Sequence, residues 1–213
     1  MKQQQLMKEA HLHMPQGVAE NYRFWGDERT LFIQNASGCR LTDSDGKTYV
    51  DFRLGYGPII LGYRDARVDD AVIRQIKQSG TLTGFATALD TEVVKQIKAM
   101  CPQIDKMRFA NSGTEAVMQA VRLARYQTGR QKIVRFTSAY HGWWDDVQPG
   151  PGNPMPPSKH TLTLREMHEN TLRVLRNRRD IACVLVNPLQ ALHPNRPAPG
   201  DSTLVDSSRT AGF

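Results

Sequence analysis

The chain has 213 residues, of which 39% are hydrophobic and 23% charged, and a formal net charge of +7. These proportions are ordinary for a globular protein and exclude a disordered or low-complexity chain. No apolar run approaches the about 20 residues that span a bilayer, and the first residues lack the apolar core of a signal peptide. We therefore expect no membrane partner and a cytoplasmic location.

The cysteines and the net charge indicate which kinds of partner and metal site to expect. Cys39, Cys101 and Cys183 are far apart and odd in number, which indicates neither a disulfide framework nor a metal site. The basic balance would suit an anionic partner such as nucleic acid, a phosphate cofactor or an acidic carrier domain. The basic residues are nevertheless scattered, and one cluster stands out: Arg173, Arg176, Arg178 and Arg179. We interpret it as a solvated helix end and expect no nucleic-acid partner.

The first third of the chain predicts a hairpin and a helix. A β-like pattern runs from Leu31 to Phe52, and the Asp45-Gly46 pair inside it is typical of a hairpin turn. A glycine-rich loop follows at Gly55–Pro58. Apolar residues then recur at helical spacing over 68–76, until Gly80 supplies a stop.

A second helix is expected from Asp90, which can cap it, to Pro102, which ends it. Its apolar face consists of Val93, Val94, Ile97 and Met100.

An α/β pattern begins at the short apolar segment Met107–Ala110, which we predict to be a strand. A helix over about 114–127 follows, and Gly129 ends it; its predicted buried stripe is Val117, Ala120, Val121 and Ala124. Lys132–Phe136 is the next predicted strand and completes a β-α-β unit, which implies a mostly parallel sheet. A helix near Leu164–Arg178 and a buried strand at Ile181–Val186 continue the alternation.

The turn Ser112-Gly113-Thr114 lies between the first predicted strand and its helix. Free N–H groups and the dipole at a helix start favour a bound phosphate, and Gly113 lets an anion approach the backbone. Ser112 and Thr114 add two hydroxyl donors. The alternative is a plain helix cap, for which one hydroxyl is enough.

Tyr140 and His141 follow the strand after the same helix. Ligands of open α/β sheets bind beyond the carboxyl ends of strands, so this loop should lie beside the Ser112–Thr114 turn. A flat aromatic side chain there can stack on a planar ring. Alternatively, Tyr140 is a boundary aromatic residue and His141 a hydrogen-bonding loop residue.

Together these motifs resemble the class III aminotransferases, and among them the glutamate-1-semialdehyde aminomutase branch. The resemblance covers roughly residues 29–188. It rests on segments in the family's order: Asp45–Phe52, Gly55–Gly62, Asn111–Ala116, Arg122–Arg125, Thr128–Arg130 and Tyr140–Gly142.

The resemblance implies an α/β fold of the fold type I class of pyridoxal 5'-phosphate (PLP) enzymes. Residues 1–65 would form an N-terminal segment with a helix, the hairpin and a substrate-side loop. Residues 66–213 would form part of the large, mainly parallel PLP-binding domain. A homodimer with active sites at its interface is also implied.

The resemblance further implies PLP-dependent transfer of an amino group from a small-molecule donor to a keto or aldehyde acceptor. Ser112, Gly113 and Thr114 would hold the cofactor phosphate. Tyr140 would stack on its ring with His141 beside it, and Tyr56 would face the substrate. Aminomutase and transaminase chemistry both remain open.

Two departures from the family pattern affect these expectations. Asn187 stands where the family usually has a glutamate near the cofactor ring. The asparagine side chain lacks the negative charge of that glutamate. Together with the unusual stretch 189–200, this also resembles aminotransferase domains embedded in polyketide or peptide synthases, whose acceptor is bound to a carrier protein. Asp206 weakly imitates the aspartate that pairs with the pyridine nitrogen; an ordinary loop or strand-end aspartate is the alternative.

The second departure is that the family's Schiff-base lysine has no match in this sequence. No lysine follows Lys159, and none of the earlier lysines has the family's position. We therefore predict no catalytic lysine and an inactive fragment. The alternative is a non-catalytic binding or interaction module that keeps the phosphate-binding half of the fold. A third interpretation, nucleic-acid binding, lacks a recognised motif.

Overall fold

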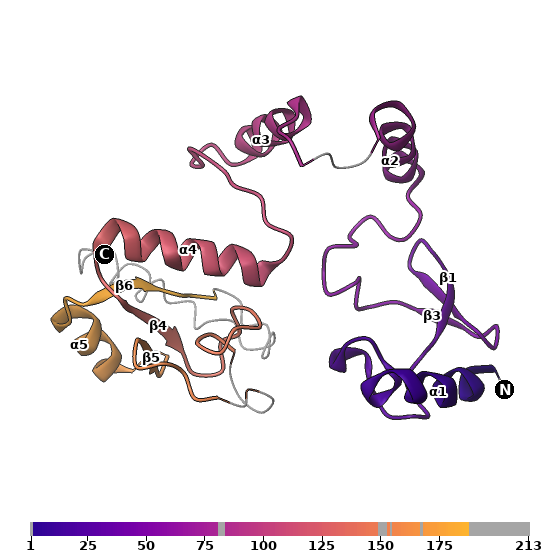
Figure 1. Cartoon of the computed structure of the whole chain (residues 1–213), viewed down its shortest axis with the longest axis horizontal. Helices are drawn as coiled ribbons and strands as arrows, with labels where there is room; N and C mark the ends of the chain where they lie inside the picture. Colours follow the sequence, from indigo (N-terminus) through magenta and orange to yellow (C-terminus); the bar gives the residue numbers. More distant parts are fainter. Residues whose placement is uncertain (1, 81–83, 149–152, 154, 167, 188–213) are drawn as a thin grey trace. The chain divides into compact units, whose positions relative to one another are not determined.

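The computed structural model describes all residues except 1, 81–83, 149–152, 154, 167 and 188–213. The chain forms two compact units, Met1–Thr91 and Glu92–Phe213 (Figure 1). The predicted division into residues 1–65 and 66–213 concerns the domains of the whole fold and stays a prediction. Asp206 and the stretch 189–200 lie outside the described residues.

The N-terminal unit is built on a three-stranded antiparallel sheet in the order β1-β2-β3. The strands are β1 (Ile33–Ser37), β2 (Arg40–Asp43) and β3 (Thr48–Val50). Asp43 secures the turn between β2 and β3, because its Oδ1 accepts from the N–H of Asp45 (3.0 Å) and of Lys47 (2.9 Å). The predicted hairpin is confirmed.

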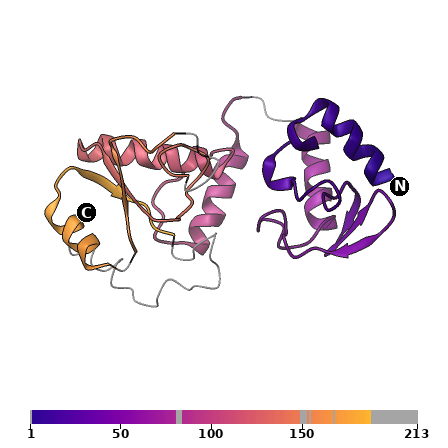
Figure 2. The same cartoon turned by 90° about the horizontal axis from the view of Figure 1, so that it is seen from below.

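Helix α1 (Lys2–His13) lies along this hairpin (Figure 2). Three hydrogen bonds hold it there: the N–H groups of Lys2 (2.7 Å) and Gln3 (3.4 Å) donate to Asp45 Oδ1, and the Phe32 N–H donates to Gln3 Oε1 (2.9 Å). Two short 3₁₀ helices, η1 (Pro15–Gly17) and η2 (Asn21–Arg23), lead from α1 towards the sheet.

Helix α2 (Ala66–Ser79) is capped by Asp65, and Gly80, with φ of 72°, ends it as predicted. None of its residues is buried, and its apolar stripe is roughly half exposed: Val68, Val72, Ile73 and Ile76. Helix α3 (Ala88–Met100) begins two residues before Asp90. The predicted cap is therefore wrong in detail: Asp90 lies in the first turn, and its carboxylate reaches back to the Thr87 N–H (3.1 Å).

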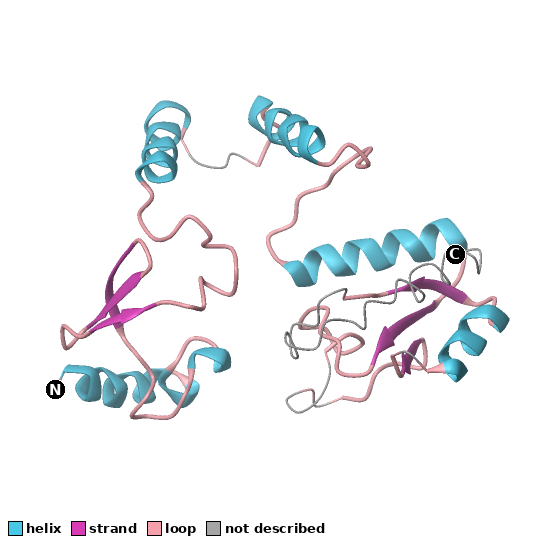
Figure 3. Ribbon diagram, turned by 180° about the vertical axis from the view of Figure 1, so that it is seen from behind, coloured by secondary structure: helices cyan, strands magenta, loops and turns pink. Residues whose placement is uncertain are grey.

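The C-terminal unit contains a three-stranded parallel sheet in the order β5-β4-β6. It contains β4 (Lys132–Phe136), β5 (Thr161–Leu164) and β6 (Ile181–Val184), with helices α4 (Gly113–Thr128) and α5 (Glu169–Asn177). Successive residues of β4 point to opposite faces. Ile133 packs with Val121 of α4, and Val134 packs with Leu175 of α5, so the two helices cover opposite faces (Figure 3). The predicted parallel sheet is confirmed.

Three sequence predictions in this unit need correction. Met107–Ala110 is no strand, because no strand among the described residues pairs with it. The helix predicted from Leu164 begins at Glu169, because the preceding residues pair with β4 as strand β5. Ala120 of α4 is exposed, so the buried stripe of this helix is narrower than predicted.

Candidate functional site

The start of α4 combines a capping box with open backbone donors. Ser112 Oγ accepts from the Glu115 N–H (3.2 Å), and the Glu115 carboxylate accepts from the N–H groups of Asn111 (2.7 Å) and Ser112 (3.1 Å). The N–H groups of Gly113 and Thr114 find no acceptor in the described part of the chain. The Ser112 hydroxyl also keeps its proton for donation. The helix start can therefore still bind an anion.

The loop after β4 closes onto this helix start. Thr114 Oγ1 accepts a hydrogen bond from the Trp143 N–H (2.9 Å). Gly142 has φ of 122°, and a Cβ there would lie 3.0 Å from both the Cα and the Oγ1 of Thr114. Only glycine allows so close an approach at this φ. Gly142 is therefore the residue that lets Tyr140 and His141 lie beside the Ser112–Thr114 turn, as the sequence predicted.

Asn187 brings a third segment to the same place. It follows β6, and its side-chain Nδ2 donates to the Tyr140 carbonyl oxygen (3.1 Å). An ionised carboxylate at this position would have no proton for such a bond. Asn187 thus holds the Tyr140 backbone, while the Tyr140 side chain stays 40% exposed and accessible to a ligand.

His141 is partly buried, and it lies near a buried arginine that the sequence analysis missed. Its Nε2 has no partner among the described residues. Burial, and then the nearby Arg135, lower the pKa of His141, so the ring is neutral at pH 7. Arg135 itself is only 7% exposed, and its Nε and Nη1 also lack partners in the described structure. Arg135 lies two residues after Ile133 on β4, and side chains two residues apart on a strand point to the same face. This spacing is the sequence feature that predicts that Arg135 faces α4 and the site.

Tyr56 belongs to the N-terminal unit, where it forms a second cluster. Its hydroxyl donates to the Tyr22 carbonyl oxygen (3.0 Å), and the two rings meet edge to face at a centroid distance of 4.7 Å. The Arg53 guanidinium carbon lies 4.2 Å from the Tyr56 ring centroid and 4.5 Å from that of Trp25. The sequence analysis named Tyr56 alone, since the other members come from segments without a recognisable motif.

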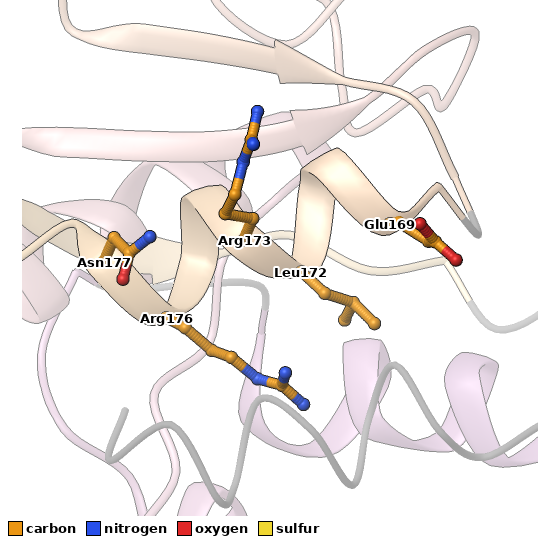
Figure 4. Close-up of a pocket in the computed structure, with 5 residues that line it drawn as sticks. All are labelled: Glu169, Leu172, Arg173, Arg176 and Asn177. Carbon is orange, nitrogen blue, oxygen red and sulfur yellow. The ribbon is translucent and has the colours of Figure 1, made fainter.

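Two surface hollows accompany these elements. One, of about 440 Å³, lies along α4 and is lined by Phe109, Ala110, Asn111, Glu115, Met118, Gln119 and Arg122. The other, of about 380 Å³, lies on α5 and includes Arg173 and Arg176, which point in different directions (Figure 4). Arg178 instead pairs with Asp180 (2.6 Å). The arginine side chains therefore do not converge on one point, which agrees with the interpretation of this cluster as a solvated helix end.

Other kinds of site are not found in the described part of the structure. No group of three metal-ligating side chains lies together there. No described helix is long and apolar enough to cross a membrane.

Comparison with known families identifies the family of the chain. The family model for aminotransferase class III matches residues 22–146, more than half of the chain. The chain belongs to the class III aminotransferases. The matched range contains the hairpin, the Ser112–Thr114 turn, and the Tyr140–Gly142 loop.

Curated members of this aminotransferase family include proteins similar to the chain. It is 41% identical over 202 residues to a glutamate-1-semialdehyde 2,1-aminomutase of Methanothermobacter thermautotrophicus, covering 89% of this chain and 48% of the relative. It is 34% identical over 206 residues to the enzyme of the same name from Methanocaldococcus jannaschii, covering 88% and 47%. The chain spans about half the length of the curated relatives it matches.

Solved aminotransferase structures show the same fold. A transaminase with PLP bound superposes with a TM-score of 0.86 at 28% identity, covering 99% of this chain and 52% of that chain. A β-phenylalanine aminotransferase from Variovorax paradoxus gives 0.85 at 29%, covering 99% and 48%. The predicted fold, an incomplete PLP-dependent transferase of fold type I, is therefore confirmed.

Proposed function

We propose that the chain supplies the N-terminal half of a PLP-dependent enzyme that transfers an amino group to a keto or aldehyde substrate. One observation carries the proposal. In a class III aminotransferase chain, the open N–H groups of Gly113 and Thr114 lie beside the Tyr140–Trp143 loop, at the carboxyl ends of parallel strands. This is where open α/β sheets bind their ligands.

The residues of this site fit the phosphate of PLP. Two free backbone N–H groups, the Ser112 hydroxyl and the helix dipole all favour a dianion at the start of α4. A Cβ built on Gly113 meets no atom within 4 Å, so the space in front of this backbone is open. Ser112, Gly113 and Thr114 are therefore our proposed phosphate ligands.

The ring of the cofactor would lie against Tyr140, whose side chain is accessible and whose backbone is held by Asn187. His141 would lie beside it in its neutral form, with Nε2 free for one hydrogen bond. When bound, PLP acts as an electron sink for bonds at the carbon that carries the amino group. Tyr56 is our proposed substrate contact.

The lysine that joins covalently to the cofactor is the missing component. Lys132, the lysine of β4, lies at the opposite end of that strand and donates to the Lys159 carbonyl oxygen (2.9 Å). Lys98 donates to the Asp105 carbonyl oxygen (2.7 Å), and Lys95 pairs with Glu92. We propose that these 213 residues alone do not transaminate, and act with a further part of the fold.

Substrate, assembly and location are further proposals. The relatives include aminomutases, and the similar solved structures include a β-phenylalanine aminotransferase, which supports an amino-acid donor. An acceptor bound to a carrier protein is proposed from the Asn187 departure. A homodimer in the complete enzyme is supported by the half-exposed apolar stripe of α2. A cytoplasmic location stays a prediction.

The test is the absorbance spectrum of the purified chain mixed with PLP, before and after borohydride. The proposal predicts a spectral change on binding and no borohydride-fixed adduct on one specific lysine. A specific lysine adduct would show that the chain carries its own catalytic residue, and no binding would remove the proposed site.

A non-catalytic binding module is the second candidate, because no lysine follows Lys159 and Lys95, Lys98 and Lys132 have other partners. It requires a unit that is stable alone. A cooperative unfolding transition of the 213-residue chain, with PLP binding but no activity gained when a C-terminal half of a class III aminotransferase is added, would favour this candidate.

A further inference from the structure

The segment that follows β4 folds back over one face of that strand. Ser138, with a φ of 64°, turns the chain directly after the strand. The His141 N–H then donates to the Val147 carbonyl oxygen (3.4 Å), which closes the segment on itself. Val147 is fully buried and packs against Ile133 of β4. The segment 139–147 therefore covers the face of β4 that carries Ile133.

Arg135 lies beneath this segment with unpaired donors. It is two residues after Ile133 and points to the same face of β4. Its side chain is buried, and its Nε and Nη1 have no hydrogen-bond partner among the described residues. It takes part in none of the ion pairs that the described residues form. Buried donors without an acceptor destabilise a fold, so an acceptor for Arg135 is expected within its reach.

The carboxylate of Asp146 is one charged neighbour of Arg135. Burial lowers the pKa of Arg135, and the attraction of Asp146 opposes this effect, so the guanidinium stays charged. Asp146 is itself buried, and its Oδ1 accepts from the Ser158 N–H (2.7 Å). Asp146 therefore balances the charge of Arg135 without satisfying its N–H donors.

His141 offers the matching acceptor. Its Nε2 is a buried atom without a partner among the described residues. Burial and the nearby Arg135 keep the pKa of His141 low and the ring neutral. A neutral imidazole carries its proton on one nitrogen and accepts at the other. Beside a cation with unpaired donors, the favoured tautomer has the proton on Nδ1 and leaves Nε2 as the acceptor.

We propose that Arg135 is a positioning residue for the Tyr140–Trp143 loop, which it holds against α4 by a hydrogen bond to His141 Nε2, direct or carried by one water. A bridging water is chemically suitable, because two donors and one acceptor would surround it. The proposal deepens the proposed function by adding a residue that places Tyr140 for the cofactor ring. It rests on that function only for the identity of the ligand, since the contact itself needs no PLP.

The first test is the tautomer of His141 in the intact chain without PLP. Long-range ¹H–¹⁵N NMR correlations at neutral pH distinguish the two tautomers, and the His141 signals are assigned by their loss in His141→Gln. We expect a proton on Nδ1 and an accepting Nε2. A proton on Nε2 would overturn the proposal, whatever any variant does.

The second test replaces the donor. Arg135→Met puts an apolar side chain at a buried position, which a fold often tolerates well. It should abolish the preference for the Nδ1 proton, raise the pKa of His141 towards its ordinary value of about 6.5, and weaken PLP binding roughly tenfold. Arg135→Lys keeps the charge and a donor, and should restore most of each effect. A loss of stability in Arg135→Met with an unchanged tautomer and pKa would show a merely structural role and overturn the proposal.

The matched control is Arg179→Met, which removes the same charge from an exposed position after α5. It should leave the tautomer, the pKa of His141 and the PLP affinity as in the wild type. Equal effects of Arg179→Met and Arg135→Met, or wild-type PLP affinity in Arg135→Met, would overturn the positioning role. An Arg135-dependent tautomer in a chain that fails to bind PLP would sustain the contact to His141 and refute the proposed cofactor site.

Discussion

Gly142→Ala should disrupt the approach of the Tyr140–Trp143 loop to α4. At φ of 122° any residue with a Cβ is strained, at a cost of about 1–3 kcal/mol. The new Cβ would also lie 3.0 Å from the Cα of Thr114, a backbone atom that cannot move aside easily. Such overpacking adds roughly another 1–3 kcal/mol. We expect the free energy of unfolding to fall by about 2–6 kcal/mol.

Urea unfolding and a PLP titration measure the two consequences. Gly129→Ala is the matched control, because Gly129 has a positive φ of 65° at the end of α4 but open space where its Cβ would lie. It should cost about 1 kcal/mol, from backbone strain alone. Gly142→Ala should weaken PLP binding roughly tenfold, whereas Gly129→Ala should not. Indistinguishable effects of the two variants would refute the steric argument.

Three further predictions concern single side chains. Thr114→Val removes the acceptor of the Trp143 N–H and should lower the free energy of unfolding by about 1–3 kcal/mol. Thr114→Ser keeps a hydroxyl acceptor and should retain most of this stability. Equal losses of unfolding free energy in the two variants would show that the hydrogen bond to Trp143 does not stabilise the fold. Burial, and then Arg135, lower the pKa of His141, so the unfolded chain binds protons more readily. Stability should therefore be full above about pH 6.5 and fall as the pH drops towards the lowered pKa, and His141→Gln should flatten this profile in urea melts between pH 5 and 7.5. Burial alone would raise the pKa of Asp51, but hydrogen bonds from two backbone N–H groups and Tyr63 outweigh it and lower the pKa. The stabilisation is thus present above about pH 4 and lost as the pH falls through the lowered pKa; Asp51→Asn should abolish this acid dependence, and an unchanged acid profile would count against it.

Local patterns were sufficient to predict many of the elements. The Asp45-Gly46 turn, Gly80 and Gly129 mark ends that depend on backbone conformations within a few residues, and the structure confirms each of them. The mostly parallel sheet also followed from the alternation of helix and strand patterns.

Predictions that depended on distant partners were less complete. Met107–Ala110 has a strand-like composition, but strand formation requires a neighbouring strand, and none that the structure describes pairs with it. Strand β5 was missed because its four residues are short enough to merge with the following helical pattern.

In the candidate site, too, the local features were predicted from the sequence and the long-range contacts were not. Ser112, Gly113 and Thr114 lie in one continuous motif, and the sequence predicted their place at a helix start. The bond from Asn187 to the Tyr140 carbonyl oxygen joins residues 47 positions apart. The cluster around Arg53 likewise joins residues of η2 to the loop after β3. Only tertiary structure brings such residues together.

The most direct test of the account compares the affinities of PLP and of pyridoxal, which lacks the phosphate, by equilibrium dialysis with the wild-type chain and Gly113→Ala. The Cβ of Gly113→Ala meets no protein atom, so the variant should fold normally while filling space that the phosphate needs. The account predicts that the wild type binds PLP far more tightly than pyridoxal, and that Gly113→Ala loses most of this preference. Equal affinity of the wild type for both compounds, or unchanged PLP binding by Gly113→Ala, would contradict a phosphate site at the start of α4.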